Sequence, residues 1–151
     1  MIRRSEPEDL EEIAETFALS FETLLSFLPD LHTREDRRRF MTEVVPLDHE
    51  IWVAEVDGRI VGLAALGETT LGHIYVHPDY LRRGIGSQLL EQTKELRPAG
   101  FTLWTFRANE PACRFYERHG LHAVAFGDGS GNEEGMPDVQ YEWRRQEAEP
   151  Q

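Results

Sequence analysis

Apolar residues recur every three or four positions in the first part of the chain, which is the spacing of an amphipathic helix. A short strand is predicted over residues 2–4, and Ser5 is a typical cap for the helix that follows it. The apolar positions predict that this helix covers residues 6–20. A second helix is predicted over residues 33–44, because Thr33 is also a typical cap.

From residue 51 onward, most segments have the alternating pattern of strands. Asp57 and Gly58 form a typical hairpin turn, which would join strands over residues 51–56 and 59–66. The further predicted elements are strands over residues 71–76, 101–106, 121–126 and 139–143, and helices over residues 84–96 and 110–119. This order predicts an α/β fold in which a mixed, mostly antiparallel sheet is flanked by helices.

The length of 151 residues suits one domain, and no repeat or linker divides it. We predict a single domain over residues 1–145 and a frayed tail over residues 146–151. No apolar run approaches the about 20 residues that span a bilayer, and the first residues lack the apolar stretch of a signal peptide. The single cysteine, Cys113, excludes an internal disulfide and argues against a cysteine-based metal site. We therefore expect a cytoplasmic protein that needs no metal.

The charge balance is strongly acidic. Lys and Arg number 16 against 28 Asp and Glu, which gives a net charge of -12. A field of this sign repels phosphates, so it argues against a partner that is a nucleic acid. The same field would attract a cationic ligand, although solubility alone also accounts for the charge.

The segment that leads into the helix over residues 84–96 has the features of an anion-binding loop. It reads VHPDYLRRGIGS, so that Gly84 and Gly86 open the helix. Glycine lets a ligand come close to the backbone, and the first amides of a helix are unpaired donors with a partial positive charge. Arg82 and Arg83 add two formal positive charges at the same place.

Two other glycine-rich phosphate loops fit this segment poorly. A Walker A loop would need lysine directly after its last glycine, but Gly86 is followed by Ser87 and Gln88. A dinucleotide-binding fingerprint would need a third glycine where the chain has Leu89. The segment therefore predicts an anion-binding loop that is neither a Walker A loop nor a dinucleotide-binding fingerprint.

The chain resembles the GNAT superfamily of N-acetyltransferases over nearly all of its length, from Ile2 to Trp143. The segments that carry the resemblance are YVHPDY at 75–80, RGIGS at 83–87, Leu89-Leu90, Asn109, Ala112, FYE at 115–117 and HGL at 119–121. The resemblance implies a GNAT fold and acetyl-CoA as the cosubstrate. It also implies that the acetyl group moves to an amine by direct attack in a ternary complex.

The resemblance further implies which residues would bind acetyl-CoA. Backbone amides near Ile74 and Val76 would hold the pantetheine arm and the acetyl carbonyl, Asn109 would bond the arm, and the small Ala112 would leave it room. The diphosphate would lie on the backbone of Arg82, Arg83, Gly84, Ile85, Gly86 and Ser87. Leu81 departs from the family, which usually has Gln or Arg there, so a side-chain contact is missing. We expect the backbone cradle to retain binding.

The candidate catalytic residues come from the same regions. Tyr116 shares a helical face with Asn109 and Ala112, and the resemblance implies that it donates a proton to the departing CoA thiolate. Glu68 and His73 lie on or beside strands that flank the predicted cleft and are candidates for the base that deprotonates the amine. Each residue also has a structural interpretation: Asn109 as a helix cap and Tyr116 as a core tyrosine. Glu68 could be a turn residue, and His73 a packed or solvent-facing strand residue. A chain of waters could act as the base instead.

The acceptor site is predicted from two segments. Residues 17–31 are rich in aromatic side chains, and the acidic loop over residues 127–137, with the adjoining Asp138, could hold a cationic amine. We expect a small-molecule or peptide amine as the acceptor, no nucleic acid or membrane partner, and a homodimer as is common in the family. The alternatives are another acyl donor, a hydroxyl acceptor, or an acyl-CoA sensor without turnover.

Overall fold

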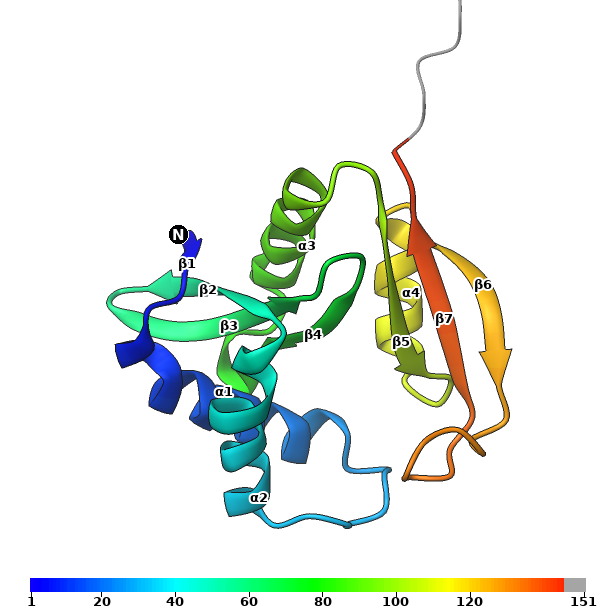
Figure 1. Ribbon diagram of the computed structural model, residues 1–151, viewed down its shortest axis with the longest axis horizontal. Helices are drawn as coiled ribbons and strands as arrows, with labels where there is room; N and C mark the ends of the chain where they lie inside the picture. Colours follow the sequence, from blue (N-terminus) through cyan, green and yellow to red (C-terminus); the bar gives the residue numbers. More distant parts are fainter. Residues whose placement is uncertain (146–151) are drawn as a thin grey trace, which may run out of the picture.

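The computed structural model describes residues 1–145 (Figure 1), so the predicted tail over residues 146–151 lies outside the described residues. Every predicted helix and strand is present. In chain order they are β1 (Ile2–Arg4), α1 (Leu10–Leu24), α2 (Arg34–Arg39), β2 (Glu50–Val56), β3 (Arg59–Leu66), β4 (Leu71–Val76), α3 (Ile85–Leu96), β5 (Phe101–Phe106), α4 (Glu110–Arg118), β6 (His122–Gly127) and β7 (Asp138–Trp143).

The two N-terminal helices differ from their predicted bounds. The chain enters α1 through a 3-10 turn capped by Glu6 rather than Ser5, and the Glu6 backbone N–H donates to Asp9 Oδ2 at 2.7 Å. The second predicted helix divides into α2 and a π-helical segment over residues 40–44. Its predicted cap is confirmed, because the Thr33 hydroxyl accepts a hydrogen bond of 3.0 Å from the N–H of Asp36.

The strands form two antiparallel sheets where one mixed sheet was predicted. The first has the order β1-β2-β3-β4 and the second the order β5-β7-β6. Between them the structure has a single parallel bridge, from Thr70 to Thr102, after which β4 and β5 diverge (Figure 1). The expectation of an α/β fold with mostly antiparallel strands is confirmed. Among residues 1–145, the divergence leaves the facing edges of β4 and β5 without strand partners beyond that bridge.

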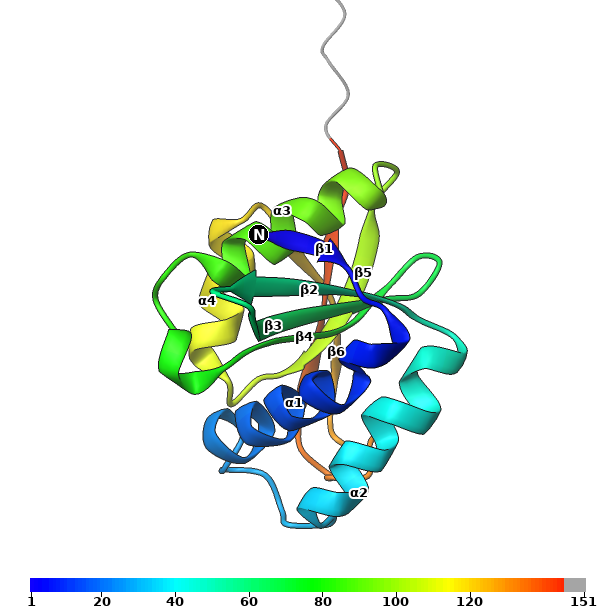
Figure 2. The same cartoon turned by 90° about the vertical axis from the view of Figure 1, so that its left-hand side faces the viewer.

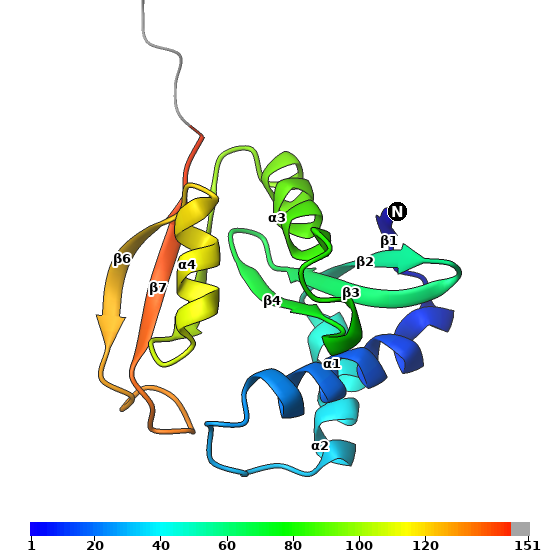
Figure 3. The same ribbon diagram turned by 180° about the vertical axis from the view of Figure 1, so that it is seen from behind.

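The helices cover both sheets and create two hydrophobic clusters. Figure 2 shows α1 and α2 on one face of the first sheet and α3 on the other, and Figure 3 shows α4 against the second sheet. One cluster packs Ile13 and Phe17 of α1 against β2 and β3, and the other joins Leu89 and Leu90 of α3 to both sheets. None of the helices within residues 1–145 is long and apolar enough to cross a membrane.

Candidate active site

A cleft of about 650 Å³ lies where β4 and β5 diverge, and it reaches the first turns of α3 and α4. Its lining includes all the residues predicted to bind acetyl-CoA except one: Ile74, Val76, Arg82, Gly84, Ile85, Gly86, Ser87, Asn109 and Ala112. The exception is Arg83, whose guanidinium lies over the ring of Tyr80, 5.0 Å from its centroid. The fold thus brings together residues from three elements, β4, α3 and α4, and from the loop before α3.

The exposed edge of β4 presents backbone groups to this cleft. In an antiparallel pair, successive residues turn their N–H and C=O groups alternately toward the partner strand and away from it. The N–H of His77 donates to the carbonyl of Val61 at 2.8 Å, which sets this alternation along β4. The amides of Ile74 and Val76 therefore point away from β3, toward the cleft. The Val76 carbonyl is already used, because the Ser20 hydroxyl donates to it at 3.0 Å.

The loop before α3 has the backbone shape of an anion cradle. Arg82 and Gly84 both have positive φ angles, 64° and 79°, which turn the chain sharply into the helix. A Cβ atom at Gly84 would meet nothing within 4 Å, so open space adjoins the backbone there. The first amides of α3 have no partners within the helix. This arrangement fits a phosphate group, and Leu81, which is 41% exposed, adds no polar side chain to it.

Asn109 has a structural role that the sequence already suggested. Its side-chain oxygen accepts a hydrogen bond of 3.3 Å from the N–H of Ala112 and so caps α4. Both residues line the cleft. Binding of a pantetheine arm by Asn109 stays a prediction, and it would have to use the other hydrogen-bonding groups of the side chain.

Tyr116 projects from α4 into the cleft with only 7% of its surface exposed. Its ring packs against Tyr141 at 5.7 Å, and its hydroxyl has no hydrogen-bond partner within residues 1–145. Burial raises the pKa of this phenol well above its ordinary value, with smaller contributions from Tyr75 and Cys113. The hydroxyl therefore keeps its proton at neutral pH.

Tyr75 is a cleft residue to which the sequence reasoning assigned no role. It belongs to β4, its side chain lies on the same face as His73, and its hydroxyl has no partner among the described residues. Burial raises the pKa of Tyr75, and the negative charge of Glu134 adds to the effect. Strand alternation could have placed it beside His73, but only the fold brings it near Tyr116 and Glu134.

His73 is held in an aromatic cluster beside the cleft. Its ring centroid lies 5.6 Å from that of Phe40, 6.1 Å from that of Phe17 and 5.8 Å from that of His49. The pKa of His73 is lowered to about 4, mainly by burial and to a smaller extent by His49, whereas Asp48 opposes the change. A full proton transfer from an ammonium group of ordinary pKa to this imidazole would be uphill by roughly 9 kcal/mol. Neutral His73 is better suited to accept a hydrogen bond than to act as the base.

Glu68, the other candidate base, is not brought to the cleft. It lies exposed in the loop between β3 and β4 and is absent from the cleft lining. The same loop contributes the bridge from Thr70 to β5, which holds it at the closed end where the two sheets meet. The structure therefore supports the interpretation of Glu68 as a turn residue.

We expect His73 to make the folded protein less stable in acid. The pKa of this side chain is about 4 in the folded protein and about 6.5 when it is exposed, so between these values only the unfolded chain binds the proton. Stability should therefore fall as the pH falls from 6.5 to 4, by about 3 kcal/mol from this group. Urea unfolding across this range should show a shallower pH dependence for His73→Gln. The same change at the exposed His122 should leave the slope intact, and equal slopes for all three proteins would contradict the assignment.

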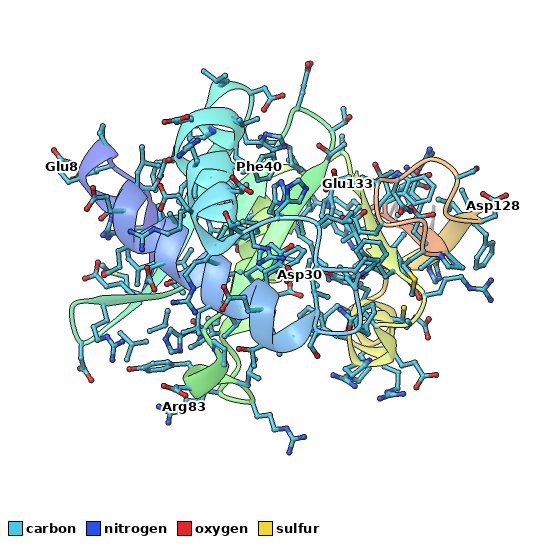
Figure 4. All side chains as sticks on the ribbon, turned by 90° about the horizontal axis from the view of Figure 1, so that it is seen from below. Glu8, Asp30, Phe40, Arg83, Asp128 and Glu133 are labelled. Carbon is cyan, nitrogen blue, oxygen red and sulfur yellow. The ribbon has the colours of Figure 1, made fainter. Side chains whose placement is uncertain are left out.

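The residue that follows the first predicted acceptor segment contacts the second segment, and the first segment itself packs against β5 at the cleft. His32, from the loop between α1 and α2, contacts Glu133 Oε1 at 2.8 Å, and Phe27 packs against Phe106 at 6.3 Å. Figure 4 shows Glu133 on the side of its loop that faces Asp30, whereas Asp128 lies at the far end. Across residues 1–145, no three His, Cys, Asp or Glu side chains lie close enough together to hold a metal ion.

The chain is similar to known proteins both in sequence and in fold. Residues 47–121, about half of the chain, match the family model described as an acetyltransferase (GNAT) domain. The peptidyl-lysine N-acetyltransferase YiaC of Escherichia coli K12 is 35% identical over 74 residues, which are 48% of this chain and 50% of YiaC. The alignment thus spans half the length of that relative.

Solved structures share the whole fold. The apo form of YjaB from Escherichia coli has a TM-score of 0.80 at 22% identity, covering 97% of this chain and 98% of YjaB. The PaiA N-acetyltransferase of Thermoplasma acidophilum, solved in complex with coenzyme A, has a TM-score of 0.73 at 19% identity, covering 95% and 98%. The match to the family model and the shared fold together show that the chain belongs to the GNAT family of acetyltransferases.

Proposed function

We propose that the protein transfers the acetyl group of acetyl-CoA to a primary amine. The observation that carries this proposal is the cleft itself, where the free edge of β4 meets an anion cradle at the start of α3. A row of outward amides suits an extended arm with carbonyl groups, and a positively charged helix start suits a diphosphate. Both parts are needed to hold acetyl-CoA, and the coenzyme A complex of the related fold supports the same ligand.

Two cleft residues have separate roles in the proposed reaction. The amine nitrogen attacks the thioester carbon, the carbon–sulfur bond breaks, the nitrogen loses one proton to water as the amide forms, and the thiolate takes a proton. Tyr116 is the proposed donor of that proton, because its phenol faces the cleft and stays protonated. Neutral His73 is proposed to accept a hydrogen bond from the amine, which must have lost its extra proton to water.

We propose a lysine side chain within a peptide as the acceptor. YiaC is named as a peptidyl-lysine acetyltransferase, and a net charge of -12 attracts cations. Tyr75 lines the cleft, and Glu134 lies close enough to affect the pKa of Tyr75. Aromatic faces suit the aliphatic stem of lysine, and a carboxylate suits its ammonium. A free small-molecule amine is the alternative acceptor.

The competing function is an acyl-CoA sensor that binds without turnover. The apolar Leu81 at the cleft favours this rival, because it removes one polar contact to the cosubstrate. Release of free thiol from acetyl-CoA, measured over a panel of lysine peptides and small amines, separates the two functions. Binding of acetyl-CoA without thiol release for any amine would support the sensor.

We expect acetyl-CoA to raise the melting temperature. A ligand that binds only the folded state stabilises it by about 2.7 kcal/mol at a concentration about one hundred times its Kd. A thermal-shift experiment with acetyl-CoA, CoA and adenosine as the control should show shifts for the first two. The absence of any shift at millimolar acetyl-CoA would refute the proposed function.

A further inference from the structure

Three side chains from α3 and α4 form a hydrogen-bonded series beside the anion cradle. Ser87 lines the cleft in the first turn of α3, and its Oγ lies 3.0 Å from Nε2 of His119. The other ring nitrogen of His119, Nδ1, lies 3.4 Å from Oε1 of Glu91. His119 itself does not line the cleft, so its hydrogen bonds can affect a ligand only through Ser87.

Glu91 determines which nitrogen of neutral His119 carries the proton. A carboxylate accepts hydrogen bonds only, so the nitrogen facing it, Nδ1, must be the donor. Nε2 is then an acceptor, and the Ser87 hydroxyl has to donate to it. In this state the Ser87 hydroxyl turns its proton away from the cleft and presents an oxygen lone pair, which repels a phosphate.

Protonation of His119 reverses the direction of the hydrogen bond to Ser87. Nε2 then carries a proton and donates to the Ser87 oxygen, which releases the hydroxyl proton to point into the cleft. The same proton gives the imidazole a positive charge close to the cradle. Both changes favour an anion, and imidazole ordinarily changes its charge between pH 5 and 8.

The charged groups around His119 are compatible with its protonation. From α3 it faces Glu91 and Lys94, which form an ion pair of 3.0 Å, and the Lys94 ammonium also donates to the His119 carbonyl at 2.7 Å. Partial burial acts to raise the pKa of Glu91, but hydrogen bonds from Lys94 and His119 hold it below its usual value. Within α4, the ring of Phe115 packs on the imidazole at 4.7 Å, and Arg118 precedes it. Glu91 thus stays ionised and supports a cationic imidazole.

We propose that His119 is a positioning residue of the anion cradle, which takes up a proton when a diphosphate binds and thereby turns the Ser87 hydroxyl toward the ligand. This inference rests on the proposed binding of acetyl-CoA at the same cleft. It predicts that affinity for the diphosphate is coupled to pH through a residue that the ligand does not touch.

The experiment uses 3′-dephospho-CoA, because its diphosphate has no group that titrates near neutral pH. Calorimetry should show a Kd about tenfold weaker at pH 8.5 than at pH 5.5, since charge-assisted hydrogen bonds are about twice as strong as neutral ones. Titrations in two buffers of different ionisation enthalpy should show net proton uptake near pH 7.

Matched variants test whether His119 and Ser87 cause the pH dependence of Kd. His119→Gln keeps a hydrogen-bonding side chain but cannot titrate in this range, so its Kd should change less than twofold with pH. Ser87→Ala keeps the histidine and removes the hydrogen bond, so it should lose most of the pH dependence and retain only the smaller part that comes from the imidazolium charge. His122→Gln, on the exposed edge strand β6, should keep the full tenfold change.

The outcomes separate this inference from the function on which it rests. Binding with the same Kd at every pH and no proton uptake would overturn the role of His119 and leave the proposed function in place. A pH dependence that persists in His119→Gln and Ser87→Ala would also overturn it. Failure of both CoA and 3′-dephospho-CoA to bind at any pH would overturn the proposed function and this inference together.

Discussion

Gly84→Val should weaken the binding of CoA by more than about 100-fold, or about 2.7 kcal/mol. The Cβ at this position points into open space beside the backbone that is proposed to hold the diphosphate, so the new methyl groups would occupy the place of the ligand. The positive φ of 79° also penalises any residue with a side chain, by about 1–2 kcal/mol of folding free energy. Calorimetry gives the affinity, and urea unfolding gives the cost in stability.

The hairpin turn between β2 and β3 offers a matched control for this substitution. Gly58 has nearly the same φ angle, 78°, and a Cβ there would also meet nothing within 4 Å. Gly58→Val should therefore cost similar stability while CoA binds normally, because Gly58 is outside the cleft lining. Equal losses of affinity in the two variants would mean that strain, rather than the ligand site, explains the effect.

Gly86→Val tests the cradle without backbone strain, because Gly86 does not have a positive φ angle. A Cβ there would lie 3.4 Å from Cζ of Phe115 and 3.7 Å from Cγ2 of Val76, so a branched side chain would enter the cleft between them. Its effect on affinity should match that of Gly84→Val. Arg83→Ala should have a smaller effect, because the Arg83 guanidinium lies over Tyr80. Normal CoA binding by both valine variants would show that the loop is not the anion site.

The order of helices and strands could be predicted from the sequence because each depends on local periodicity and turn residues. The helix start at Gly84 and the hairpin at Gly58 are examples, since a positive φ at each favours glycine. The division into two sheets could not be predicted in the same way. It depends on β4 and β5 making one bridge and then separating, and pairing between strands is not fixed by local periodicity.

In the candidate site too, some residues could be assigned from the local sequence, whereas the environment of others depends on distant parts of the chain. The loop before α3 is continuous in sequence, so its residues could be assigned from their order alone. The environment of His73 depends on Phe17, Phe40 and His49, which lie in other elements, so its lowered pKa could not be foreseen. The contact between Ser87 and His119 joins residues 32 positions apart. The sequence therefore identifies candidate residues, but side chains that are distant in the sequence determine their chemistry.

Tyr116→Phe should lower kcat by about 100-fold and leave the affinity for acetyl-CoA nearly unchanged. The substitution removes only a hydroxyl, and that hydroxyl has no hydrogen-bond partner within residues 1–145, so the packing of the ring against Tyr141 should persist. A proton donor acts mainly as charge develops on the leaving sulfur, so its loss should appear in kcat. General acids contribute about 100- to 10,000-fold, and a thiolate is already a good leaving group, which places the expected loss at the lower end.

Tyr141→Phe is the matched control, because its hydroxyl has a structural task. It donates to Glu117 Oε2 at 2.7 Å, and Tyr141 is absent from the cleft lining. Its removal should cost about 1 kcal/mol of stability without changing kcat per folded molecule. Tyr116→Phe should therefore turn over slowly with a normal melting temperature, whereas Tyr141→Phe should turn over normally with a lowered melting temperature. If Tyr116→Phe instead melts early and turns over normally, Tyr116 is a core residue, and the thiolate must take its proton from water.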